Sequence, residues 1–137
     1  VAIAAEMMGS ALEAFERTVT YLKEREQFGA LIGSFQALQH RAAHMQADIE
    51  LCRSVVLQAL STVDDAPHQL PPLASLAKAK LNELAKLVTN EAVQMHGGIG
   101  VTDALEIGFF LKRARVAMQI FGDTGYHKDR YATLSGY

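Results

Sequence analysis

The strongest chemical signal in the sequence is a glycine-rich segment at residues 94–100, which reads Gln-Met-His-Gly-Gly-Ile-Gly. Glycines let a backbone come close to a ligand, and successive N–H groups can hold phosphate oxygens. No strand precedes the segment, so it differs from the strand-turn-helix fingerprint of dinucleotide-binding folds. A tight turn between two helices explains the same glycines equally well. The residues alone leave both interpretations open.

Residues 25–29, Arg-Glu-Gln-Phe-Gly, form a second cluster and are followed by Phe35 and Gln36. The guanidinium of Arg25 suits a diphosphate, because it can form paired hydrogen bonds. The simpler interpretation is that Arg25 complements the dipole at a helix end, that Phe28 is an ordinary core residue and that the glycine ends the helix. Considered alone, the cluster favours this simpler interpretation.

The third cluster is Phe-Gly-Asp-Thr-Gly at residues 121–125. A carboxylate between two glycines, here Asp123, can serve as a general base on a loop. The simpler alternative is that Asp123 only caps a following helix. Both roles stay open at this point, and capping is the favoured one.

Two further patterns indicate no site. His40 and His44 lie four residues apart on one helix face, as zinc ligands can, but the intervening residues hold no glutamate and no third ligand is indicated. Lys112, Arg113 and Arg115 form a short basic run that a solvated helix face explains. We therefore expect no metal site and no nucleic-acid partner.

The composition is that of an ordinary globular domain. The chain has 137 residues, of which 50% are hydrophobic and 20% charged, with a net charge of -2. This length supports one domain with a core over residues 1–137. Cys52 is the single cysteine, which excludes an internal disulfide, and no apolar run is long enough to span a membrane. Because the sequence starts at Val1 inside a helical pattern, we expect a fragment of a longer chain.

Helical periodicity positions the three clusters. Apolar residues recur at three- and four-residue spacing, and all three prolines lie within residues 67–72. The pattern predicts four long helices and a tail segment, with approximate bounds 1–24, 35–62, 71–96, 103–121 and 126–134. Short connections between long helices predict an all-α fold, an antiparallel four-helix bundle with a short C-terminal tail helix.

Capping signals suggest where these helices begin. Ser34 is a plausible N-cap for the second helix, whose inward apolar face is expected to reach Leu60. Asp103 and Glu106 have the spacing of a capping box at the start of the fourth helix. We therefore expect the second helix to start directly after Ser34 and the fourth near Asp103.

Together, the clusters resemble a known family. Three segments are similar to the acyl-CoA dehydrogenases in residue type, order and separation. They are residues 21–29, Tyr-Leu-Lys-Glu-Arg-Glu-Gln-Phe-Gly, residues 32–36 and residues 94–100. The resemblance covers nearly the whole chain and implies the C-terminal domain of that family, a four-helix bundle that also forms oligomer contacts. It implies an FAD enzyme that oxidises an acyl-CoA thioester to the trans-2-enoyl-CoA. A carboxylate removes the α-proton while the β-hydride passes to the flavin.

The resemblance also implies particular contacts with FAD. These are Arg25 with the pyrophosphate, Phe28 and Gln36 with the adenosine portion, and Gln94, Gly97 and Gly98 with the same region of the cofactor. In this family, such contacts are made to FAD that is held mainly by the neighbouring subunit.

One position departs from the family pattern. Many members carry the catalytic glutamate in a Tyr-Glu-Gly-Thr stretch after the fourth helix. A gapless alignment from Gly98 puts that glutamate at Phe121, which cannot take a proton, while Gly122 keeps the glycine. We therefore expect the base to be Asp123 or a residue outside this chain. Glu6, on the first helix, is a weaker candidate.

The resemblance leaves two interpretations of the whole protein. One is a dehydrogenase to which this domain supplies FAD contacts and an oligomer interface. The other is a non-catalytic subunit of a heteromer that completes a partner's FAD site. A stand-alone helical module and an oxidase relative are weaker alternatives.

The implied partners are an acyl-CoA substrate and an electron-transfer flavoprotein, in the cytoplasm or the mitochondrial matrix, and the acyl chain stays open. The isolated domain is expected to be inactive, because the family's flavin ring and thioester rest largely on two other domains.

Overall fold

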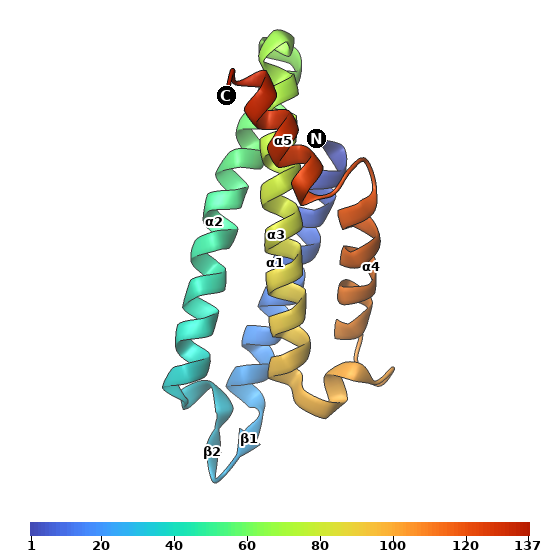
Figure 1. Ribbon diagram of the computed structural model, residues 1–137. Helices are drawn as coiled ribbons and strands as arrows, with labels where there is room; N and C mark the ends of the chain where they lie inside the picture. The colour runs from blue at the N-terminus through green and yellow to red at the C-terminus, as the bar shows by residue number, and fades with distance from the viewer.

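The computed structural model describes residues 1–137 and consists almost entirely of helices (Figure 1). The long helices are α1 (Ala2–Glu24), α2 (Gln36–Asp65), α3 (Leu70–His96) and α4 (Ile107–Gln119), and they are followed by α5 (Thr124–Leu134). Successive long helices run in opposite directions, and α3 packs against all the other helices. The predicted antiparallel four-helix bundle with a short C-terminal tail helix is therefore confirmed.

Short elements fill the connections between the helices. An antiparallel hairpin and three 3-10 helices take these places: β1 (Glu26–Gln27), β2 (Ala30–Leu31), η1 (Ile32–Ser34), η2 (Pro67–Gln69) and η3 (Gly97–Val101). In Figure 1 the hairpin and η3 lie at one end of the bundle, whereas α5 packs near the other end. The first two sequence clusters therefore share one end of the fold.

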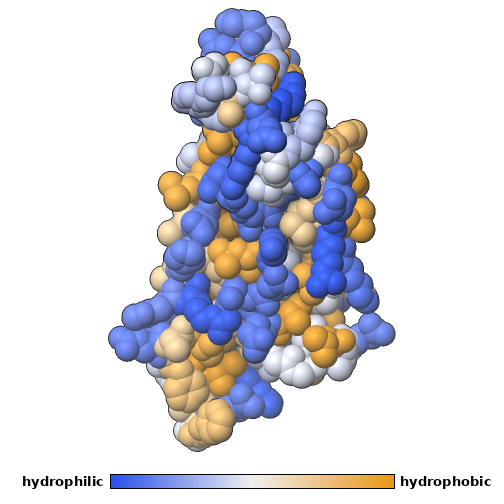
Figure 2. Space-filling view, viewed as in Figure 1, coloured by the Kyte–Doolittle hydropathy of each residue, from blue (hydrophilic) through white to orange (hydrophobic).

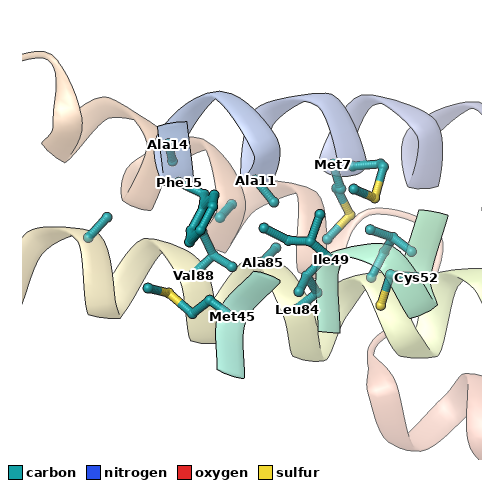
Figure 3. Close-up of a cluster of buried hydrophobic side chains, with 14 of the residues drawn as sticks. Met7, Ala11, Ala14, Phe15, Met45, Ile49, Cys52, Leu84, Ala85 and Val88 are labelled. Atoms are coloured by element: carbon teal, nitrogen blue, oxygen red, sulfur yellow. The ribbon is translucent and has the colours of Figure 1, made fainter. Parts of the chain in front are cut away.

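The core lies where α1, α2 and α3 face one another (Figure 3). Ile49, Leu81 and Val88 are completely buried there. Full burial of a side chain of this size contributes about 1.5–3 kcal/mol to stability. Leu60 was expected on the same inward face of α2 but is 42% exposed, because Ala59 and Thr62 take the buried positions there. No helix has both the length and the apolar character that a membrane span requires.

Ser34 is not the N-cap of α2. The helix begins at Gln36, its N-cap is Phe35, and no side chain caps it. The Ser34 hydroxyl instead donates to the Leu31 carbonyl at 2.7 Å and closes η1. The start of α2 is therefore set by the end of the hairpin and η1, not by a serine cap.

The capping box predicted at Asp103 is also absent. α4 begins only at Ile107, and a turn occupies the residues between η3 and the helix. The Glu106 carboxylate accepts a hydrogen bond from Arg17 Nη1 at 2.7 Å, so it contacts α1 and does not fold back on Asp103. The fourth helix is consequently shorter than the sequence pattern predicts, and it ends at Gln119.

Candidate functional site

A pocket of about 460 Å³ opens at the hairpin end of the bundle. It is lined by most of the residues expected to contact the cofactor, namely Arg25, Phe28, Gln94, Gly97 and Gly98. Gln36, the other expected contact, is exposed at the first residue of α2 and does not line the pocket. The segment around Arg25 and the glycine segment are about seventy residues apart in sequence. They meet at the pocket because α1 and α3 both end there.

The hairpin holds Phe28 in a strained and exposed position. Phe28 and Gly29 form its two-residue turn, with φ angles of 56° and 76°. Positive φ at both central residues defines a type I′ turn, which usually takes asparagine and glycine. A bulky residue in this region is uncommon and costs energy, and such strain concentrates at functional sites. The turn therefore presents an aromatic side chain at a conformational cost.

Phe28 is 93% exposed, so the interpretation of it as a core residue is wrong. Its ring meets the Phe35 ring edge-on, with centroids 6.3 Å apart. Figure 2 shows apolar surface gathered over this end of the molecule. Two aromatic rings therefore stand on the outer wall of the pocket, where a flat ligand could pack against them.

The glycine segment has different roles at its successive positions. Gly97 ends α3 with φ 67° and ψ -146°, a conformation that other residues adopt only with strain. A Cβ atom at Gly100 would lie 2.8 Å from the Val93 carbonyl oxygen, so close packing requires a glycine there. Gly98 has no positive φ and open space around its Cα. The helix-to-helix turn therefore explains Gly97 and Gly100, but it does not explain Gly98.

Tyr21 and His96 form part of the pocket wall. Their rings stack with centroids 4.3 Å apart. The Tyr21 hydroxyl donates to the His96 carbonyl at 3.4 Å, and His96 Nδ1 lies 2.7 Å from the Ala92 carbonyl oxygen, to which it can donate. This stack fixes the end of α1 to the end of α3. It was not predicted, because the two residues meet only through packing.

The pocket carries a cation without a partner. Arg25 is exposed and forms no ion pair within this chain, whereas Arg41, also on the pocket wall, donates through Nε to Glu91 at 2.6 Å. A free guanidinium beside aromatic rings and open backbone favours an anionic ligand with a flat ring, such as a nucleotide diphosphate. The arrangement is therefore suited to binding such a ligand.

Asp123 lies in the turn between α4 and α5, away from this pocket and toward the other end of the bundle (Figure 1). Its Oδ1 accepts a hydrogen bond from the Tyr126 amide at 2.8 Å, which confirms that Asp123 caps α5. Phe121, in the same turn, is exposed and has a φ of 62°. The structure therefore does not bring Asp123 together with Arg25.

Two buried basic groups lie beneath this turn. Lys78 Nζ donates to the Gly122 carbonyl at 3.0 Å, and His127 Nε2 lies 2.9 Å from the Phe121 carbonyl oxygen. Burial lowers the pKa of Lys78, and the nearby Asp123 partly offsets this. Burial also lowers the pKa of His127. Neither residue was predicted from the sequence, because nothing in their local sequence connects them to the turn.

Comparison with known proteins identifies the family. The family model described as acyl-CoA dehydrogenase, C-terminal domain, matches residues 1–133. The acyl-CoA dehydrogenase IpdE2 of Mycolicibacterium smegmatis is 40% identical over 120 residues, which are 88% of this chain and 37% of that protein.

Solved structures agree with this match. Butyryl-CoA dehydrogenase from Megasphaera elsdenii superimposes with a TM-score of 0.93 at 27% identity, over 98% of this chain and 35% of that one. An FAD complex of PigA gives a TM-score of 0.89 at 26% identity, over 97% and 34%. The chain thus spans a little over a third of the length of these relatives. It belongs to the acyl-CoA dehydrogenase family and corresponds to the C-terminal domain of that family.

Proposed function

We propose that this chain is the C-terminal domain of an FAD-dependent enzyme that oxidises an acyl-CoA thioester between Cα and Cβ. In this proposal, the pocket at the hairpin end holds the diphosphate and adenosine portion of FAD. The observation that carries it is the meeting of unpaired Arg25, exposed Phe28 and open Gly98 around one pocket. These residues fit FAD, because a guanidinium suits phosphate oxygens and an aromatic ring suits adenine. FAD supplies the hydride acceptor when it is bound.

The positions of the pocket and of Asp123 favour a shared active site between subunits. The pocket lies at the C-terminal end of α3, whereas the turn that carries Asp123 contacts α3 at Lys78, and the 18 residues from Lys78 to His96 span about 27 Å of helix. We infer that the pocket and this turn serve different flavins, with the pocket completing the FAD site of a neighbouring subunit. This arrangement makes an oligomer, homomeric or heteromeric, part of the function.

Reduction of the flavin by substrate tests the proposal. The full-length protein, purified with its flavin, is mixed anaerobically with a panel of acyl-CoA thioesters, and the visible flavin absorbance is followed. Bleaching by one of them is expected, and it would also define the acyl chain. Bound FAD that no thioester bleaches would contradict the dehydrogenase activity. The electron acceptor we propose is a flavoprotein, and the compartment is the cytoplasm or the mitochondrial matrix.

Asp123 is our candidate for the base, and Asp123→Asn tests it in the same full-length protein. Asparagine also caps helices well, so α5 should stay in place while the carboxylate is lost. We expect the rate of flavin reduction to fall by about a hundredfold or more, which is the scale of general-base catalysis. The matched control is Asp129→Asn, at an exposed position of α5. Its rate should equal that of the wild type.

An unchanged rate in Asp123→Asn would exclude Asp123 and leave Glu6 or a residue outside this chain as the base. Bound FAD in the wild-type protein that no thioester bleaches would instead favour the second candidate function, a subunit without its own base that completes a partner's FAD site. The observation that favours this second function is Phe121, which stands where a gapless alignment puts the family's glutamate. Copurification of a second subunit that carries a base would then be expected.

A further inference from the structure

The turn between α4 and α5 rests on a buried polar cluster. Four of its members are almost inaccessible: Ser75, Lys78, Asn82 and His127. Lys78 lies on α3, the central helix of the bundle, and is only 3% exposed. A charged group is rarely buried this deeply unless all its donors are used, because its desolvation is costly. The partners of Lys78 therefore indicate what it does.

All three N–H donors of the Lys78 ammonium have an acceptor. Nζ donates to Asn82 Oδ1 at 2.7 Å, to the Met118 carbonyl at 3.3 Å and to the Gly122 carbonyl at 3.0 Å. Two of these acceptors are main-chain carbonyls at the end of α4 and in the turn that follows. A cation at a helix C-terminus is favoured, because it complements the partial negative charge there. Lys78 thus ties the turn to α3.

Asn82 supports the same assignment. It is 1% exposed, and its Nδ2 has no hydrogen-bond partner. Leaving a buried N–H without an acceptor is unfavourable. The amide oxygen nevertheless faces the Lys78 ammonium and accepts a hydrogen bond from it at 2.7 Å.

The turn itself needs such support. Phe121 is 78% exposed with a φ of 62°, and Gly122 has a φ of 110°. A Cβ atom at Gly122 would lie 2.4 Å from the Tyr126 ring, so any residue other than glycine would collide with that ring. Strained backbone of this kind persists only where the surroundings determine it fully.

We propose that Lys78 is a positioning residue, which holds the turn at Phe121–Asp123 and so sets where this turn presents its groups to the acyl thioester. The inference rests on the proposed function for its link to the reaction, but the contact of Lys78 with the turn does not depend on it. His127, which meets the Phe121 carbonyl from α5, acts alongside Lys78.

The test compares Lys78→Met with wild type in the full-length, FAD-loaded protein. Methionine keeps the length of the side chain but removes the charge and the donors. Lys86→Met is the matched control, because Lys86 lies exposed on the same helix. If Lys78→Met does not fold, Lys78→Gln replaces it, since glutamine keeps an N–H donor. Two quantities are measured: amide hydrogen exchange by peptide, and the rate of flavin reduction against thioester concentration.

We expect exchange over residues 119–127 in Lys78→Met to rise by about tenfold or more, while residues 25–35 at the hairpin end exchange as in the wild type. We expect the limiting rate of flavin reduction to fall by about tenfold or more, with little change in the half-saturating thioester concentration. Lys86→Met should change neither quantity. If Lys78 only stabilised the bundle, its replacement by methionine would raise hydrogen exchange at both ends of the bundle.

Three results would overturn the proposal. They are unchanged exchange over 119–127, an equal rise at the hairpin end, and a normal limiting rate despite faster exchange in the turn. If no thioester reduces the flavin of the wild-type protein, the proposed function fails separately. The exchange data then decide alone whether Lys78 holds the turn.

Discussion

Replacing Arg25 by glutamine in the full-length protein is expected to weaken FAD binding by about ten- to a hundredfold. A hydrogen bond to a charged group contributes about 1.5–3 kcal/mol, and about 1.4 kcal/mol corresponds to a factor of ten in affinity. The bundle should stay intact, because Arg25 is exposed and forms no ion pair. Its carbonyl, which accepts from the Ile32 amide at 2.8 Å, is unaffected by the substitution.

The measurement is a titration of flavin-free protein with FAD, followed by the quenching of flavin fluorescence. The matched control is Arg53→Gln, because Arg53 lies on α2 outside the pocket and pairs only with Glu50 on its own helix. Thermal unfolding of both variants checks the fold. Wild-type affinity in Arg25→Gln would show that the pocket does not hold the diphosphate.

Helix periodicity and glycines predicted the architecture well, because both act locally. α1 ends at Glu24 as expected, and α3 ends at His96, directly before a glycine with positive φ. A glycine in that conformation stops a helix whatever surrounds it. The apolar stripes likewise need only the helical repeat to be recognised.

The predicted caps failed because a capping pattern has competitors in three dimensions. Glu106 has the right spacing from Asp103, but Arg17 of α1 offers it a charged partner at 2.7 Å. Ser34 has the right chemistry, but its hydroxyl closes the preceding 3-10 turn. Neither partner can be seen in a local window of sequence, so helix starts were predicted less accurately than helix ends.

The candidate site shows the same contrast between residues that local sequence marks and residues that only helix packing brings in. Arg25, Phe28 and the glycines stand in short contiguous segments, and the structure brings them to one pocket. Arg41 lines the same pocket from α2, where no motif marks it. Lys78 contacts its turn from 44 residues away in sequence. Contacts of this range depend on how helices pack, which the sequence pattern does not specify.

The two glycines Gly98 and Gly100 should separate ligand binding from folding when each is changed to alanine. At Gly100 the new methyl group would meet the Val93 carbonyl oxygen at 2.8 Å and the His96 Cβ at 3.0 Å. Overpacking against backbone costs about 1–3 kcal/mol, so we expect Gly100→Ala to lower the unfolding temperature of the flavin-free protein. At Gly98 the methyl group meets nothing, so the stability of Gly98→Ala should stay within about 0.5 kcal/mol of wild type.

FAD binding should show a different pattern in Gly98→Ala. The open face of Gly98 lines the pocket, so its methyl group would occupy space that the cofactor needs, and we expect an affinity loss of about tenfold. Each variant serves as the control for the other, since both carry the same change two residues apart. Normal FAD affinity in Gly98→Ala would remove this glycine from the binding site. A stable Gly100→Ala would show that the turn can move away from α3 at little cost, so close packing would not require a glycine at this position.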